Sequence, residues 1–524
     1  MSRWVRIASP LCLLLLASSA SASAGPLVED AGHIHWLQRD NAWYRGVGVL
    51  NANGDSTPDV VIAGGDRDAS YYQCLAPPGF PGATVNQHKD TVLVPAAKMG
   101  ILDGRTGDPL WETAWRPGGD VVDPPSDDVW HLVSGVHTGD LDGDGADDLV
   151  VIRTEKPKDR SMDQTQHITS YDPRTGAVEW DVTQTVPADQ PPIAVLTPMD
   201  VFGTPGALLT QITISIAFSG SGVDVRIDGS NQVVQLEPGK APKKVIDLPA
   251  DLGFAVPTRY GDGYRFVAFP IRISGAPPAI TASVDAHAVD LVRNANGQPR
   301  FEEAWSRPAA GGTPWHISGG ADPAVVVGRP TGSGTAGNVV AMDLDTGADR
   351  WTAAINVGPG GGTLVTQDVN ADGVEDVIAS PAFGDDPTGL LTGGPFAELH
   401  AFNGRNGQPL WAKTDPLAKF RAHALELIDI DGSGAPEIVG IMTGQDGFPM
   451  CSTPSDDTGM VSVWDAATGA QKCRLHTDRF PSDLVGANLN GEAGKEIVVP
   501  TLGGNVYSFT NAEPGCGPLG TNPL

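Results

Sequence analysis

The chain has 524 residues, a net charge of −29, 65 glycines, 44 prolines and only 6% aromatic residues. A surface this acidic argues against binding to nucleic acid or to anionic lipid. The glycine and proline content predicts many turns and short strands rather than long helices.

The first 24 residues predict a secretory signal peptide. Arg3 and Arg6 precede an apolar run that is too short to anchor in a bilayer, and the small residues Ala22 and Ala24 mark a cleavage site. We therefore expect an exported protein, extracellular or periplasmic, with no membrane insertion and with residues 25–524 forming a single domain. Cleavage leaves an even number of cysteines, which suggests disulfides in an exported chain and leaves three pairings open: Cys74, Cys451, Cys473 and Cys516.

Five nine-residue stretches share an acidic loop that leads directly into a β-branched run. They are named by the repeat unit to which they belong: loop one (51–59), loop two (140–148), loop six (368–376), loop seven (429–437) and loop eight (488–496). Each has oxygen-bearing side chains at positions 1, 3 and 5 and a carboxylate at position 9. These residues are Asn51, Asn53, Asp55, Asp59; Asp140, Asp142, Asp144, Asp148; Asp368, Asn370, Asp372, Asp376; Asp429, Asp431, Ser433, Glu437; and Asn488, Asn490, Glu492, Glu496.

The spacing of these loops predicts eight repeat units. Loops six, seven and eight begin 61 and 59 residues apart, and the 228 residues from loop two to loop six equal four intervals of 57. Three units without the acidic loop are therefore expected near residues 200, 260 and 320, where apolar strand-like runs remain. The longer first interval, 89 residues, is explained by an insertion around 66–92.

A second phrase, a strand followed by a Thr-Gly or Asn-Gly turn and another strand, recurs later in most units. It ends in Trp111, Trp180, Trp351 or Trp411, in Cys473 in the seventh unit, and more loosely in Trp305. Glycine supplies the positive φ of the turn, and the tryptophan is expected to fill the space between packed sheets. Each unit then has four antiparallel strands, which predicts an all-β fold, a β-propeller with eight blades, rather than the alternative of a linear solenoid. The eighth unit has only three strands, so the segment 31–38, which contains Trp36, is expected to supply its fourth strand and close the last blade.

The acidic loops predict calcium ions. Clustered carboxylates repel one another unless a cation neutralises them, and hard oxygen ligands at alternating positions suit Ca²⁺ better than Mg²⁺. The alternative is that Asp, Asn and Gly simply make good turns. We expect up to five Ca²⁺ sites, with the four-carboxylate loop two binding most tightly and loop eight most weakly.

The loop pattern D-x-D-x-D-G-x-x-D followed by a strand resembles the FG-GAP repeat of integrin α-subunit propellers and of bacterial VCBS-repeat proteins. This resemblance implies calcium held by side chains at positions 1, 3, 5 and 9 and by the carbonyl at position 7. Integrin propellers have seven blades, so seven is the alternative to eight. The phrase "AMDLDTGADRW" is similar to the tryptophan-docking motif of eight-bladed quinoprotein propellers, although their adjacent cysteines are absent from this sequence.

No catalytic residue can be singled out, because the sequence has no G-x-S-x-G, H-E-x-x-H or G-x-x-x-x-G-K-[ST] motif. We predict a monomeric, non-catalytic calcium-binding module for adhesion to an extracellular protein or carbohydrate. The alternative is an extracellular enzyme such as a polysaccharide lyase, with its site at the channel mouth. Side chains expected at that mouth, unless they pack between blades, are Trp130, His131, Trp315, His316, His423, Tyr71 and Tyr72.

Overall fold

The computed structural model describes most of the predicted repeat units. It covers residues 34–39, 42–66, 97–115, 129–157, 163–187, 192–219, 222–249, 252, 255–274, 281–312, 315–319, 322–330, 336–356, 363–380, 396–444, 459–477, 481–501 and 505–510. The predicted signal peptide, Tyr71, Tyr72 and the cysteines other than Cys473 lie outside these residues.

The fold is all-β, and its four-stranded antiparallel sheets are the blades of an eight-bladed β-propeller, as predicted. The chain divides into two compact units. Among the described residues, the first unit comprises 134–329 and 339–352, with most of blades two to five; the second comprises 34–133, 330–338 and 353–510, with blades one, six, seven and eight.

In the second unit, blade one consists of β2 (Ala42–Leu50), β3 (Asp59–Asp66), β4 (Ala97–Leu102) and β5 (Pro109–Trp115). Blades six and seven form one seven-stranded sheet because they share one long strand, β27. Its strands are β24 (Thr363–Gln367), β25 (Asp376–Ser380), β26 (Phe396–Phe402), β27 (Pro409–Ile428), β28 (Glu437–Gly444), β29 (Gly459–Trp464) and β30 (Gln471–Thr477). Blade eight consists of β31 (Val485–Ala487), β32 (Glu496–Pro500), β33 (Asn505–Phe509) and β1 (Ile34–Arg39).

In the first unit, blade two consists of β6 (Val129–Gly139), β7 (Asp148–Pro157), β8 (Gln164–Tyr171) and β9 (Val178–Val186). Blade three consists of β10 (Pro192–Asp200), β11 (Pro205–Ser219), β12 (Gly222–Glu237) and β13 (Lys240–Asp247). Blade four consists of β14 (Ala255–Tyr260), β15 (Gly263–Ala268), β18 (Ala286–Arg293) and β19 (Pro299–Arg307), with an inserted hairpin, β16 (Ile271–Ser274) and β17 (Thr281–Val284). Blade five consists of β20 (Trp315–Ile317), β21 (Ala324–Pro330), β22 (Ala336–Asp343) and β23 (Asp349–Asn356). The three units expected without acidic loops are thus present.

The second strand of each blade carries the apolar run that follows the first loop, β-branched in most blades, and this run is buried on both faces. In β3, Val60, Val61 and Ile62 are each at most 1% exposed. Val60 and Ile62 pack with Val498 and Val506 of blade eight, in a core between neighbouring sheets. Continuous apolar runs, rather than alternating ones, are expected for strands covered on both sides.

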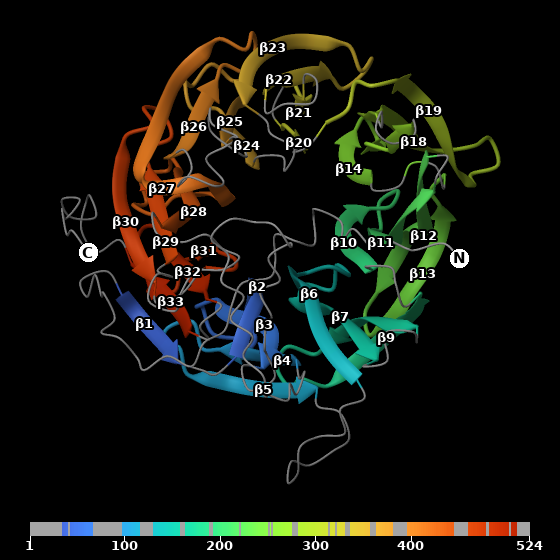
Figure 1. The fold of residues 1–524 in the computed structure, drawn as a ribbon. Helices are drawn as coiled ribbons and strands as arrows, with labels where there is room; N and C mark the ends of the chain where they lie inside the picture. Colours follow the sequence, from blue (N-terminus) through green and yellow to red (C-terminus); the bar gives the residue numbers. More distant parts are fainter. Residues whose placement is uncertain are drawn as a thin grey trace. The chain divides into compact units, whose positions relative to one another are not determined.

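The N-terminal strand closes blade eight, which confirms the sequence-based expectation. β1 pairs antiparallel with β33, with Leu37 opposite Tyr507, and the two strands lie side by side in Figure 1. Pairing the first described strand with the last removes an exposed sheet edge.

Two tryptophans of the repeated phrase pack between neighbouring sheets, as predicted, and each also docks against the turn of the following blade. Trp305 donates from Nε1 to the Leu344 carbonyl at 2.9 Å and lies against Gly347, where an added Cβ would meet the indole at 2.6 Å. Trp411 bears the same relation to Gly469 and donates to the Ala466 carbonyl at 3.1 Å. Both glycines have positive φ, 67° and 65°. Glycine at these positions therefore allows both the positive φ of the turn and the close approach of the ring.

In the part of the chain that is described, no helix has the length and apolar character needed to cross a membrane.

Candidate metal-binding loops

The five acidic loops connect the first and second strands of their blades and share one backbone conformation. Position 4 is left-handed in all of them, with φ of 78° at Gly54, 82° at Gly143, 68° at Gly432 and 77° at Gly491. Ala371 takes the same place in loop six at 59°, where a Cβ is strained. The glycine pattern of the loop is therefore set by the turn itself.

Side-chain oxygens hold each loop through hydrogen bonds from its own backbone, as loop two illustrates. Asp140 Oδ1 and Oδ2 accept from Gly143 N and Gly145 N at 2.7 and 3.1 Å. Asp142 Oδ1 accepts from Asp144 N at 3.1 Å, and Asp144 Oδ1 accepts from Ala146 N at 2.7 Å. These are Asx turns in series, so part of the pattern serves turn formation.

The position-9 carboxylate ties the loop to the second strand. One of its oxygens accepts from the position-2 amide at 2.9 Å in loop one, 2.8 Å in loop two, 3.1 Å in loop six, 3.0 Å in loop seven and 2.6 Å in loop eight. Asp59 and Asp376 are 0% exposed, and Glu437 and Glu496 are 3% exposed. From the sequence, calcium binding was the only explanation for an acid at position 9 in every loop. These hydrogen bonds give a second explanation, because the acid also closes the loop.

In loops one and six, the other oxygen of the position-9 acid is also satisfied within the protein. Asp59 Oδ1 accepts from Asn53 Nδ2 and from Gly104 N, both at 3.3 Å. Asp376 Oδ1 accepts from Asn370 Nδ2 at 3.1 Å and from Gly404 N at 2.9 Å. An asparagine at position 3 and a glycine in the later turn therefore supply the donors that a buried carboxylate needs.

Loop two lacks both donors. Position 3 is Asp142, and the residue corresponding to Gly104 is Pro173, which has no N–H. No hydrogen-bond donor among the described residues reaches Asp148 Oδ1, while Oδ2 accepts from Leu141 N and Asp142 N at 2.8 and 3.2 Å.

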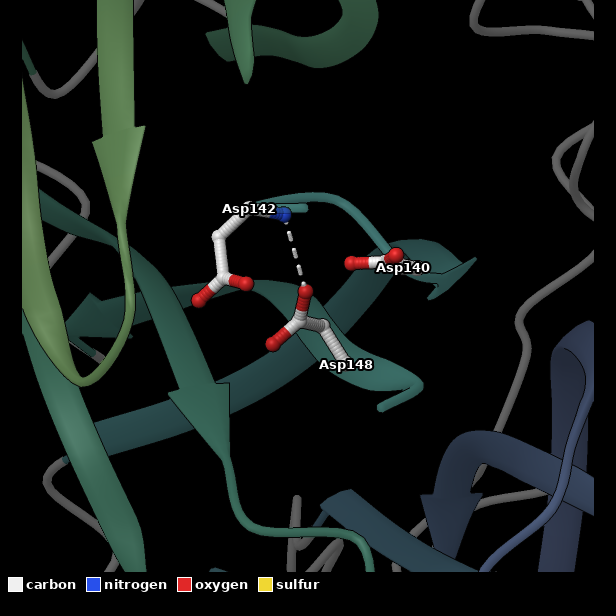
Figure 2. A group of neighbouring side chains, drawn as sticks. All are labelled: Asp140, Asp142 and Asp148. Atoms are coloured by element: carbon white, nitrogen blue, oxygen red, sulfur yellow. Dashed lines mark hydrogen bonds between the residues drawn. The ribbon is translucent and has the colours of Figure 1, made fainter. Parts of the chain in front are cut away.

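The carboxylates of loop two converge, and no cationic side chain among the described residues forms an ion pair with them. Ligand oxygens of Asp140, Asp142 and Asp148 all lie within 4.8 Å of one another, and Figure 2 shows the three groups pointing toward a common space. Burial raises the pKa of Asp148 to about 6, and the charges of Asp142 and Glu179 add to the shift. Burial likewise raises the pKa of Asp142, together with the charges of Asp144 and Asp140. Ionising all of these carboxylates together is therefore unfavourable, and a bound cation would lower this electrostatic cost.

Loop seven has the second group of three converging carboxylates, but a lysine of the same blade neutralises part of its charge. Oxygens of Asp429, Asp431 and Glu437 lie within 4.8 Å of one another. Lys472 of β30 places Nζ 3.1 Å from Asp431 Oδ2 and forms an ion pair with Glu437 Oε1. Hydrogen bonds from Ser433 and Lys472 lower the pKa of Asp431 to about 2. Lys472 was not among the residues predicted for this site, although it stands just before Cys473 in the repeated phrase.

The remaining loops have no such group of three acidic or histidine side chains among the described residues. In loop six, Arg405 Nε lies 3.4 Å from Asp372 Oδ1, and Asn403 Nδ2 donates to Asp372 Oδ2 at 3.0 Å. In loop eight, Asn490 Nδ2 contacts Thr510 Oγ1 at 3.4 Å. Asp144, the predicted position-5 ligand of loop two, is not part of the converging group.

The predicted ligand face is described only in part. Trp130 and His131 lie on β6, Trp315 and His316 on β20, and His423 on β27. His316 is half-buried, and the other four side chains lie outside what the structure describes. Their grouping around a ligand stays a prediction.

No protein-family model matches the chain, and no curated protein matches its sequence. Solved structures that are similar include the rhamnogalacturonan lyase YesW, at 14% identity and a TM-score of 0.38, and the exotype rhamnogalacturonan lyase YesX, at 14% identity and a TM-score of 0.40. Each of these alignments covers 91% of both chains. BamB from Moraxella catarrhalis is similar at 15% identity and a TM-score of 0.34, over 80% of this chain and 90% of that one.

Proposed function

We propose that this chain is an exported, calcium-binding β-propeller of the FG-GAP type that acts as a non-catalytic binding or adhesion module. The observation that supports it most directly is loop two. Three carboxylates converge there, and Asp148 Oδ1 has no hydrogen-bond donor in the described part of the chain. An acceptor-only cluster of hard oxygens on a tight loop is the chemistry that Ca²⁺ selects.

The ion would stabilise the fold rather than take part in a reaction. Asp148 begins β7, whose next residues, Leu149 to Ile152, are at most 1% exposed. A cation at loop two would therefore fix the entry to a core strand of blade two. Binding at ten times the dissociation constant would add about 1.4 kcal/mol to stability.

Calcium titration tests this function. Isothermal titration of the metal-free protein should show Ca²⁺ binding that Mg²⁺ does not match, and Asp148→Asn should remove the tightest site. Equal heats for both ions, or a tightest site unchanged by Asp148→Asn, would refute the assignment. Binding by the other four loops stays a prediction.

The adhesion role needs its own assay, because calcium binding alone does not identify a partner. Immobilised extracellular proteins and polysaccharides should retain the calcium-loaded protein without being cleaved. Turnover of a polysaccharide that His131→Ala or His316→Ala abolishes would instead establish the alternative, a propeller enzyme.

A further inference from the structure

One position on the fourth strand changes its charge from blade to blade, and in blades five and seven its side chain reaches the first loop of its own blade. It is the residue just before the tryptophan or cysteine that ends the repeated phrase. Its occupants are Leu110 in blade one, Glu179 in blade two, Arg350 in blade five, Leu410 in blade six and Lys472 in blade seven.

In blade seven this residue is a cation held between loop carboxylates. Lys472 Nζ bridges Asp431 Oδ2, at 3.1 Å, and Glu437 Oε1, and Glu437 is 3% exposed. These are the position-3 and position-9 acids, two of the side chains that were predicted to bind calcium. The ammonium group therefore contacts the same oxygens that a metal ion would use.

Blade five shows that a cation at this position reaches the first loop even where the acidic pattern is lost. Arg350 Nη1 lies 2.9 Å from Asp322 Oδ1, in the segment between β20 and β21, and Nη2 lies 2.9 Å from Asp343 Oδ2. In this loop a serine, rather than an acid, links the two ends: Ser318 Oγ accepts a hydrogen bond from Ala324 N at 2.8 Å.

In blade two the same position carries the opposite charge. Glu179 is the extra residue of the β-bulge between β8 and β9, just as Lys472 is the extra residue of the corresponding bulge between β29 and β30. Its Oε2 accepts from Ser170 Oγ at 2.8 Å, which holds the carboxylate on β9. Blades one and six carry the neutral Leu110 and Leu410, and their loops use the position-3 asparagines Asn53 and Asn370 as donors.

We propose that this fourth-strand residue decides which acidic loop binds a calcium ion. Lys472 occupies the place of the metal ion in loop seven and so prevents calcium from binding there. Glu179 instead adds a negative charge near loop two, which increases the affinity of that loop for a metal ion. The proposal rests on the proposed calcium function and assigns its selectivity to two residues that lie outside the loops.

Counting bound calcium in charge-swapped variants tests the assignment. The purified chain and its variants are dialysed against buffered Ca²⁺, and the bound ions per chain are measured by mass spectrometry. Lys472→Gln should bind one ion more than the wild type, and Glu179→Lys should lose one ion or bind it at least tenfold more weakly. Lys472→Glu, which copies blade two, is the second variant should Lys472→Gln unfold.

Matched controls change the same charges on fourth strands of blades without acidic loops. Lys244→Gln on β13 and Glu303→Lys on β19 should leave the calcium count unchanged. An increase with Lys244→Gln equal to that with Lys472→Gln would mean that net charge alone is responsible, and would overturn the proposal.

The failure of this inference differs from the failure of the proposed function. If the wild type binds calcium and neither Lys472 variant gains an ion, the role of Lys472 is refuted while the calcium function stands. If the wild type binds none but a Lys472 variant gains one, the native calcium function is refuted while the blocking role of Lys472 is upheld. If no form binds calcium, both are refuted.

Discussion

Asp142→Asn should stabilise the protein clearly without calcium and much less with calcium. The substitution gives loop two the position-3 asparagine that loops one and six use. In those loops the amide donates to the position-9 carboxylate at 3.3 and 3.1 Å. In loop two the corresponding acceptor, Asp148 Oδ1, has no donor among the described residues.

The size of the effect follows from the carboxylate that receives the new donor. A shift of the Asp148 pKa from 3.8 to about 6 corresponds to about 3 kcal/mol of unfavourable ionisation, which sets the upper limit of the gain. A hydrogen bond to a charged acceptor contributes about 1.5–3 kcal/mol. Because Asp148 is only half-buried, we expect the metal-free variant to be more stable than the wild type by about 2 kcal/mol.

In calcium most of this gain in stability is lost. Loss of one carboxylate ligand with a tenfold loss of affinity reduces the calcium-dependent gain by about 1.4 kcal/mol. Urea unfolding of both proteins, in chelator and at a fixed Ca²⁺ concentration, measures the two quantities. Asn370→Asp in loop six is the reciprocal control and should destabilise the metal-free protein. Equal shifts of Asp142→Asn in chelator and in calcium would refute the reasoning.

Three further predictions concern loop closure, pH and blade packing. Asp376→Ala removes the buried acceptor of three backbone amides and should cost about 3 kcal/mol in chelator by urea unfolding; a loss below about 1 kcal/mol would contradict its closing role. Burial raises the pKa of Asp483, which accepts from Val47 N at 3.3 Å, to about 6. Its stabilising contribution is therefore present below about pH 4 and lost as the pH rises through 6, by at most about 3 kcal/mol. Asp483→Asn should flatten this part of the pH profile, and an unchanged profile would rule the carboxyl out as its source. Gly347→Ala places a Cβ 2.6 Å from the Trp305 ring at a φ of 67° and should lower stability by about 2–3 kcal/mol in thermal denaturation; an unaltered melting temperature would contradict the docking account.

The propeller could be predicted from the sequence because its evidence is local and repeated. The interval between acidic loops gave the number of blades, and the β-branched runs after position 9 marked the buried second strands. The incomplete eighth unit indicated the closing strand, since three strands leave a sheet edge that 31–38 could fill. Trp305 and Trp411 were recognisable because each ends a strand that follows a glycine turn.

Other features depend on strand register and could not be read from spacing. Blades six and seven share β27, because the strand continues from Pro409 to Ile428 where two separate strands were expected. The contact of Lys472 with Asp431 joins residues 41 positions apart and depends on how β30 lies against loop seven. The position-9 acids also close their loops, a role that the turn pattern alone did not show.

The metal content and thermal stability of the purified protein test the central claim most directly. After dialysis against Ca²⁺, the chain should retain at least one calcium ion, and chelation should lower its melting temperature while Asp148→Asn shows a smaller decrease. A protein that retains no calcium and melts at the same temperature with and without chelator would contradict the account.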